Sequence, residues 1–359
     1  MTPRLLMMAF IFLASGGCGT GSPPERSDGI TAPPAQDVRS MEEDTIRTHD
    51  TVANSDEISA EDSASPEVLP TCIHGWDAPK IEMNLALHPL PEVSGMVASH
   101  SRPGLLWMHN DSGDAALLHP VFVDAPPASP VLLEGVIAVD FEDIGRSRCP
   151  HVDADCLWIA DTGNNLLDRE ELVVYRVVEP ELPPDSTTGT RSVEAASIRF
   201  RYPGETVDSE ALLVEPNGET FWLVEKTGAA DARLFRGDAR RMDGVQTLQE
   251  MGSFASPGVD IQDGLGRMIT GADLHPLADR VLIRTYTGSF EHVLPESAMM
   301  DLLTAEPHLV AWGPLSESQG EAIAYDSTGT RVHTASENGS AADPGFQPLH
   351  GYDCLGRQD

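Results

Sequence analysis

The chain repeats one line of sequence, and this repeat constrains its fold more than any other feature. DSEALLVEPNGETFWLVEKTG, residues 208–228, aligns without a gap to QGEAIAYDSTGTRVHTASENG, residues 319–339. In both segments a glutamate is followed by alanine, and glycines stand eight and eighteen positions after that glutamate. Because a self-similar period is typical of repeat architectures, further copies are expected elsewhere in the chain.

Three more copies begin at Val93, Asp140 and Ile269. Each copy has an apolar opening segment, a polar turn, a second apolar segment and a polar residue two places before glycine. The opening positions, 48 to 68 residues apart, are Ser94, Glu142, Glu210, Ala272 and Glu321. The closing positions are Asp111, Asp161, Lys226, Tyr286 and Glu337.

Each copy has the pattern of a β-hairpin, because residues alternate with period two on both sides of a turn. Third strands are expected at 173–180 and 232–238. A unit of three or four antiparallel strands cannot bury its face alone, and a radial array of such units is a propeller. We therefore predict an all-β, single β-propeller with five blades, or six if one degenerate copy is hidden. Residues 80–88 are expected to complete the last blade.

Three tryptophans occupy the same place in the second strand of their copies: Trp107, Trp158 and Trp222. Identical placement in three blades favours packing between blades over a ligand-stacking surface.

The first 18 residues have the pattern of a targeting segment. Arg4 precedes an apolar run too short to span a membrane, and small residues lead to Cys18. The pattern resembles a bacterial lipoprotein signal, in which Cys18 becomes the lipidated first residue and anchors the chain to the cell envelope, at the outer membrane or cell surface. Ser15 stands where that signal usually has leucine, so ordinary secretory cleavage is the alternative.

Residues 19–70 are rich in Ser, Pro, Asp and Glu and are expected to be a disordered acidic tether. Residues 71–359 then form the propeller, which we expect to be monomeric. The formal net charge of −34, with lysine only at Lys80 and Lys226, argues against a nucleic-acid partner.

Four cysteines remain after Cys18, an even number that indicates disulfides in an exported chain. Position favours Cys149 with Cys156, across a short loop, and Cys72 with Cys354, at the two ends of the folded part. The alternatives are buried thiols, or a metal site formed by the nearby pair with His151 and Asp153.

The copies from Val93, Asp140 and 208–228 resemble exported bacterial propellers of the SdiA-regulated (YjiK-like) and NHL-like groups, and more distantly the esterase-like phytase domain. The resemblance spans about residues 85–340. It implies a five-bladed propeller with a calcium site, in a group of which most members have no assigned reaction.

Opening strands of a propeller line its central channel, so Glu142, Glu210 and Glu321 are expected to point toward one axis. Calcium suits such an all-oxygen cluster, and further ligands are expected at the ends of the second strands. These additional candidates are Asp111, Asp161, Asn110 and Asn164. The alternative is structural: the glutamates accept hydrogen bonds from backbone amides or pair with Arg284, Lys226 or Arg146, joining blade to blade.

Two classes of function stay open. No GxSxG, Walker, HExxH or EF-hand motif is present, and no catalytic residue is predicted, which favours a binding or scaffolding module for a protein, glycan or small molecule. The alternative is a metal-dependent phosphoesterase, in which Lys226 and Arg284 would clamp phosphate. His109 is interpreted as a strand-end histidine with local hydrogen bonds.

Overall fold

The structure is a computed structural model that describes residues 75–86, 89–125, 128–182, 191–313, 317, 319–337 and 346–356. The expected signal segment, the expected tether and Cys72 lie outside these residues. Within the described part, none of the helices is long and apolar enough to cross a membrane.

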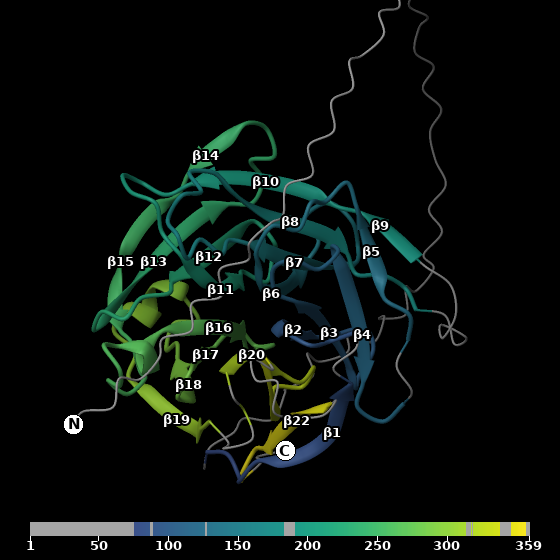
Figure 1. The fold of residues 1–359 in the computed structure, drawn as a ribbon, viewed down its shortest axis with the longest axis vertical. Helices are drawn as coiled ribbons and strands as arrows, with labels where there is room; N and C mark the ends of the chain where they lie inside the picture. Colours follow the sequence, from purple (N-terminus) through teal and green to yellow (C-terminus); the bar gives the residue numbers. More distant parts are fainter. Residues whose placement is uncertain are drawn as a thin grey trace, which may run out of the picture. The chain divides into compact units, whose positions relative to one another are not determined.

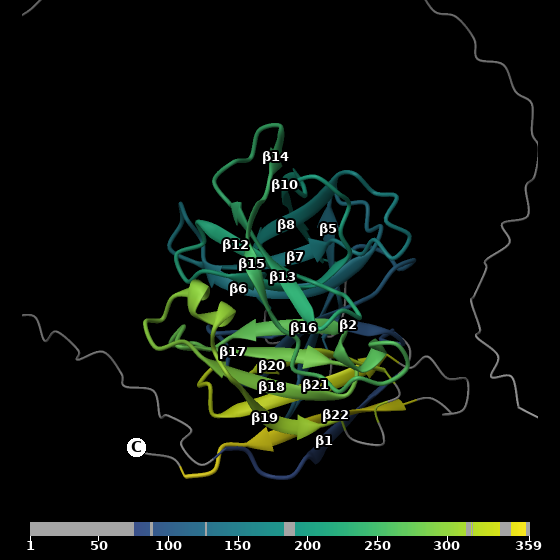
Figure 2. The same cartoon turned by 90° about the vertical axis from the view of Figure 1, so that its left-hand side faces the viewer.

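The described residues form a five-bladed β-propeller, as the repeat predicts (Figures 1 and 2). The first blade contains β2 (Val93–Ala98), β3 (Leu105–Asn110), β4 (Leu117–Phe122), β5 (Val131–Glu134) and β9 (Arg191–Glu194). The second contains β6 (Phe141–Arg148), β7 (Asp155–Asp161), β8 (Leu172–Val178), β10 (Ala196–Arg201) and β14 (Val245–Thr247).

The other three blades are four-stranded. The third contains β11 (Ser209–Val214), β12 (Thr220–Glu225), β13 (Asp231–Asp238) and β15 (Gln249–Ala255). The fourth contains β16 (Ile269–Leu274), β17 (Arg280–Thr285), β18 (Gly288–Val293) and β19 (Pro307–Trp312). The fifth contains β20 (Gln319–Tyr325), β21 (Arg331–Glu337), β22 (Phe346–Asp353) and β1 (Lys80–Ala86). Two 3-10 helices, η1 (Leu265–Arg267) and η2 (Met299–Leu303), lie in connections.

The innermost strands of the blades are β2, β6, β11, β16 and β20, and they surround the centre of the ring (Figure 1). Each contacts the innermost strand of both neighbouring blades. Strands β2 and β11 are buried at every residue, whereas β13, farther out, alternates between buried and exposed positions. The difference arises because a strand at the centre is enclosed on both faces, whereas a strand farther out has one face toward solvent.

The core is divided into layers between neighbouring blades. Trp107 packs with Phe141 and Ile144 of the second blade, and Trp158 packs with Leu212 of the third. Trp222 packs with Ile283 of the fourth blade in the same way. The tryptophans therefore join blades, as their equivalent positions predict.

The fifth blade is closed by the amino-terminal strand of the described chain. Strand β1 pairs antiparallel with β22, in a register that runs from Lys80 opposite Gly351 to Ala86 opposite Phe346. This closure, which the sequence predicts for residues 80–88, ties the first strand of the ring to its last.

Two short outer strands cross between blades, which the repeat does not predict. Strand β9 follows the second blade's β8 in sequence but pairs in parallel with β5 of the first blade. Strand β14 lies between β13 and β15 of the third blade in sequence but pairs in parallel with β10 of the second. Both strands cover an edge that would otherwise present unpaired backbone groups.

The Cys149–Cys156 disulfide is confirmed, with an S–S distance of 2.00 Å. It closes the loop between β6 and β7. Cys354 is also disulfide-bonded. Its expected partner, Cys72, lies outside the described residues, so that pairing stays a prediction.

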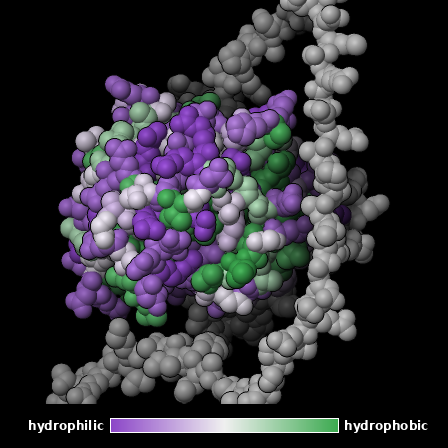
Figure 3. Space-filling view, turned by 90° about the horizontal axis from the view of Figure 1, so that it is seen from above, coloured by the Kyte–Doolittle hydropathy of each residue, from purple (hydrophilic) through white to green (hydrophobic). Residues whose placement is uncertain are grey.

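Hydrophilic side chains cover most of the face drawn in Figure 3, and hydrophobic ones gather there in smaller groups. This distribution fits the acidic composition and leaves most apolar side chains of the ring inside, between blades.

Candidate metal centre

Every inner strand contains a β-bulge near its beginning. The strand registers shift between Val93 and Gly95, Phe141 and Asp143, Ser209 and Ala211, Ile269 and Gly271, and Gly320 and Ile323. A bulge leaves an extra residue unpaired and redirects its side chain. The residues inside these shifts include Ser94, Glu142, Glu210, Thr270 and Glu321.

The bulge corrects one position of the sequence alignment. In the fourth blade the equivalent of the glutamates is Thr270, two residues before the Ala272 that the repeat assigned. Thr270 donates a hydrogen bond from Oγ1 to the carbonyl of Gly320 at 3.0 Å. Ser94 donates from Oγ to the carbonyl of Glu142 at 2.6 Å. These two hydroxyl groups therefore join neighbouring blades, whereas the three glutamates at the other bulges bring charge.

Three carboxylates meet at this end of the ring: Asp111, Asp140 and Glu142. One oxygen of each lies within 4.8 Å of an oxygen of the others. Asp111 directly follows β3, and Asp140 directly precedes β6, which carries Glu142. The first and second blades thus both contribute to the group, which we call the acidic triad.

Glu142 is only 3% exposed, and its carboxylate makes no hydrogen bond within the described residues. Gly163 allows this crowding. A Cβ at position 163 would lie 2.0 Å from Oε1 of Glu142 and 2.3 Å from Oδ2 of Asp140. The glycine that ends the second repeat is therefore required for the close approach of two carboxylates to the backbone.

Burial and like charge raise the pKa of each member of the acidic triad. Burial, followed by Glu321 and Glu92, raises the pKa of Asp111 to about 6. Burial and Asp111 raise the pKa of Asp140 to about 6. For Glu142, burial and the charges of Glu210 and Asp111 raise the pKa well above its usual range. A cation among these oxygens would reverse the direction of all three shifts.

Lys226 neutralises part of the adjoining charge. Its Nζ forms an ion pair with Oε1 of Glu210 and lies 5.5 Å from the ring centre of Tyr286. Burial opposes the lysine charge, but Glu210, Tyr286 and Glu142 raise its pKa well above the usual range. The other oxygen of Glu210, Oε2, is buried without a hydrogen-bond partner.

Glu321 belongs to a hydrogen-bonded group in the fifth blade. Nε2 of Gln319 donates to Oε1 of Glu321 at 2.9 Å and also contacts Oε2 of Glu337. Burial, Glu321 and Asp111 raise the pKa of Glu337 to about 11. Glu337 therefore keeps its proton to a higher pH than an ordinary glutamate, which lowers the negative charge beside Glu321.

Asp161 lies beside the acidic triad but is held by other partners. Its Oδ1 accepts a hydrogen bond from Arg169 at 2.7 Å and from the backbone amide of Asp140 at 3.1 Å. The hydrogen bond from the Asp140 amide fixes the backbone of Asp140. Asp161, itself held by Arg169, therefore positions one member of the triad.

The remaining predicted ligands also have local partners. Asn110 donates to Pro89 at 2.8 Å and to Asp114. Asn164 donates to Arg169 at 3.1 Å and to Val207, and it accepts from the amide of Arg169. Both asparagines thus fix loops around the cluster with their amide groups.

The partners of Arg284 are residues outside the acidic triad. It forms a buried ion pair with Glu317 and donates to Ser289 at 2.8 Å. Glu317 also accepts from Thr334 at 2.6 Å and contacts His350 at 3.1 Å. The arginine is therefore part of a polar network between the fourth and fifth blades.

Two further carboxylates hold the inner strands together, and the sequence analysis did not assign them this role. Oδ2 of Asp143 accepts from the backbone amides of Leu212 at 2.7 Å and Ala272 at 3.1 Å. Oδ2 of Asp273 accepts from the amide of Tyr325 at 2.8 Å. Asp143 thus joins the second, third and fourth blades, and Asp273 joins the fourth and fifth. Asp143 directly follows Glu142, and Asp273 directly follows the Ala272 that the repeat assigned, so an apolar strand interrupted by an acid is the sequence signal that could have indicated them.

His109 has the local role expected for it. Its Nδ1 lies 2.9 Å from the carbonyl oxygen of Asn110, and its ring packs edge-on against Phe141. Burial lowers the pKa of His109 to about 4, so the ring is neutral at pH 7.

No protein-family model matches this chain, and none of the curated proteins compared with it matches. The five-bladed fold is therefore established by the structure, and the resemblance to named propeller families stays a prediction.

Proposed function

We propose that the protein is an exported, lipid-anchored binding or scaffolding propeller that holds a calcium ion at the acidic triad. One observation carries the metal assignment: Glu142 is buried, lacks a hydrogen bond and lies among other carboxylates. An ionised group in that setting is unfavourable unless a proton or a cation compensates it.

The residues of the triad fit a hard cation. Calcium takes six to eight oxygen ligands in flexible geometry, whereas magnesium requires a near-ideal octahedron. Asp111, Asp140 and Glu142 would supply the protein oxygens, and the partial exposure of Asp111 and Asp140 leaves room for water. When bound, the ion supplies positive charge that joins the end of β3 to the start of β6.

A binding module is supported by the absence of a clamp for phosphate within the described residues of this site. Lys226 is paired with Glu210, Arg169 with Asp161, and Arg284 with Glu317. A phosphoesterase needs cations that can reach its substrate. The binding or scaffolding function is therefore favoured over the phosphoesterase, and turnover of a phosphomonoester that is lost in Glu142→Gln would overturn this order.

The anchor rests on the pattern ending at Cys18. We expect the parent protein to fractionate with membranes and the Cys18→Ser variant to be released. Equal membrane association of the two would contradict lipidation at this cysteine.

The metal assignment is tested by thermal unfolding of the full chain in calcium and in chelator. Calcium at 100 times its Kd should stabilise the fold by about 2.7 kcal/mol. For a domain of this size that corresponds to about 5 °C in Tm. Glu142→Gln should abolish the calcium response and raise the Tm in chelator, because a buried charge is removed.

Glu306→Gln is the matched control, since Glu306 is exposed and distant in sequence from the triad. It should respond to calcium as the parent does. A parent protein whose Tm is the same in calcium and in chelator would refute the metal site.

A further inference from the structure

A cavity lies at the opposite ends of the inner strands from the acidic triad. It has a volume of about 190 Å³ and is lined by Arg146 of β6, Val214 of β11 and Leu274 of β16, together with His100 after β2. Arg146 follows Glu142 by four residues on the same strand, which corresponds to about 13 Å. The two ends of the ring therefore differ in charge: acids gather at one, and an arginine opens into a cavity at the other.

Arg146 has no hydrogen bond or ion pair within the described residues, and its Nε is buried without a partner. Burial lowers its pKa, although Asp273 and Asp155 act in the opposite direction. Unpaired guanidinium groups are costly to bury, because each carries five donors that need acceptors. An anion that enters the cavity would supply them.

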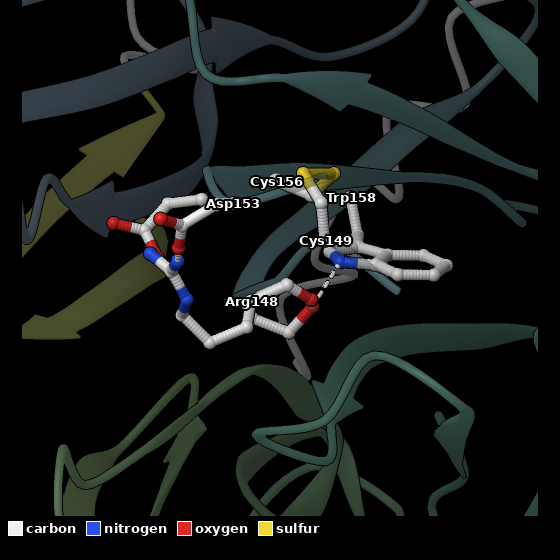
Figure 4. Close-up of a disulfide and its surroundings, with 7 residues drawn as sticks. Arg148, Cys149, Asp153, Cys156 and Trp158 are labelled. Carbon is white, nitrogen blue, oxygen red and sulfur yellow. Dashed lines mark hydrogen bonds and ion pairs between the residues drawn. A yellow bond between two sulfur atoms is a disulfide. The ribbon is translucent and has the colours of Figure 1, made fainter. Parts of the chain in front are cut away.

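The neighbouring arginine is already satisfied. Arg148 forms ion pairs with Asp153 and, at 3.0 Å, with Asp155 (Figure 4). The Cys149–Cys156 disulfide holds the same loop. Nε1 of Trp158 donates a hydrogen bond to Oγ of Ser147, beside this loop, at 2.8 Å. Arg148 also lines the cavity, but two aspartates compensate its charge, whereas Arg146 forms no ion pair within the described residues.

His100, Arg146, Ser147, Arg148, Asp155 and His275 give the cavity polar walls, and the rest of its lining is apolar. Val214, Pro216, Leu274 and Pro276 line it. A cavity of 190 Å³ is below the roughly 300–1,000 Å³ typical of complete small-molecule sites, so it holds a head group rather than a whole ligand.

A larger cavity of about 470 Å³ shares Pro216 and Leu274 with the first. Its lining includes Trp222, Met251, Met299 and Met300. Methionine side chains adapt to flexible apolar ligands. The two cavities are therefore neighbours, and the larger one combines these apolar side chains with the polar residues Glu215, Asn217, Arg236 and Ser297.

We propose that these two cavities together bind an organic acid with an unbranched apolar chain, with its carboxylate on Arg146 and its chain among the methionines. A guanidinium matches a carboxylate through two parallel hydrogen bonds. A phosphate dianion fits less well, because Asp155 also lines the head-group cavity and Arg146 is its one unpaired guanidinium. Partial burial, with Arg146 and Arg148, lowers the pKa of His100 to about 4, so this histidine adds no charge at pH 7.

Calorimetric titration of the full chain with butyrate, octanoate and inorganic phosphate tests the proposal. Chelator is present throughout, so that a metal at the acidic triad cannot bind the carboxylate. Octanoate should bind at least tenfold more tightly than butyrate, because four more methylenes are buried. Arg146→Gln should weaken octanoate binding by at least tenfold.

Arg241→Gln is the matched control, since it removes the same charge from an exposed residue that lines neither cavity. It should leave octanoate binding unchanged. Met300→Asp, which places a charge in the larger cavity, should weaken octanoate binding and spare butyrate.

Arg146→Gln is expected to fold, because it removes a cation that has no partner. If it does not, Arg146→Lys keeps the charge but loses the paired geometry and should weaken octanoate binding severalfold. Octanoate binding that is unchanged in the position-146 variant, or phosphate binding tighter than octanoate binding, would overturn the proposal.

Discussion

Glu142 and Asp143 are neighbours on the same strand, and both are almost fully buried, yet their surroundings are opposite. Asp143 accepts hydrogen bonds from three backbone amides on three strands: Leu212, Ala272 and Ile144. Glu142 accepts none and faces Asp111 and Asp140. Burial raises the pKa of both, but only at Asp143 do amide hydrogen bonds oppose the rise.

The comparison separates two uses of a buried carboxylate. A group whose oxygens are occupied by amides contributes to folding, because its removal leaves several donors without partners. A carboxylate surrounded by other carboxylates is repelled by them, and a bound cation can relieve that repulsion. The bulge at position 142 creates the difference. Glu142 is left out of the pairing between β6 and β7, whereas Asp143 takes part in it.

Asp143→Ala should produce the largest effect. It leaves three buried amides unpaired, and we expect a loss of about 3–5 kcal/mol in the free energy of unfolding. Chemical denaturation measures this value. Asp143→Asn, which keeps one acceptor oxygen, should lose less, and a loss below about 1 kcal/mol in the alanine variant would remove the distinction from Glu142.

Gly163→Ala should act on the acidic triad without removing any carboxylate. The new Cβ would displace the Glu142 and Asp140 carboxylates, so most of the calcium response of about 5 °C should disappear. The Tm in chelator should change little, because both carboxylates are ends of side chains that can move. Gly204→Ala is a control for glycine replacement, since a Cβ there meets nothing within 4 Å, although its positive φ costs some stability. A full calcium response in Gly163→Ala would show that the ion does not bind at the Glu142 and Asp140 carboxylates.

Asp140→Asn should give the smallest effect, visible as a pH dependence. The pKa of Asp140 rises from 3.8 to about 6 on folding, so the folded state binds more protons between these values. The contribution of Asp140 to stability therefore falls as pH rises from about 4 to about 6. In chelator, the Tm of the variant relative to the parent should increase by about 2–4 °C over this window.

Buried histidines titrate in the same window with the opposite sign. Burial lowers the pKa of His109 and His119 to about 4, so their contributions to stability rise with pH. Both histidines are present in the parent and in Asp140→Asn, so their contributions cancel in the difference between the two Tm values. A difference in Tm that stays constant from pH 4 to 6 would show that Asp140 is not crowded by like charges.

The blades could be predicted because each is written locally, as a hairpin with period-two alternation and a turn. The equivalent tryptophans, Trp107, Trp158 and Trp222, even indicated which surfaces meet. Strands β9 and β14 could not be predicted in this way. They are three or four residues long, and their parallel pairing exists only because the ring brings distant segments together.

The site was predicted in part for a related reason. Repeat alignment identified Glu142 and Asp111 but not Asp140, although Asp208 and Glu92 stand at the equivalent place, two residues before Glu210 and Ser94. The fourth bulge was misplaced at Ala272, because spacing along the chain does not show which residue leaves the strand pairing. Lys226 and Arg284 both lie near the end of a second strand, two positions apart in the repeat, and their partners differ: Lys226 pairs with Glu210 and Arg284 with Glu317.

The pairing of β1 with β22 has a consequence for biosynthesis. The strand translated first in the ring waits for the strand translated last, so a nascent chain can assemble four blades while its fifth is still incomplete. Contacts between such distant segments form slowly, because the whole intervening chain must first be ordered. A product truncated before β22 would keep β1 as an unpaired strand, whose free backbone groups could pair with another copy of the chain or be cleaved by a protease. Quality control of this protein therefore depends on β22.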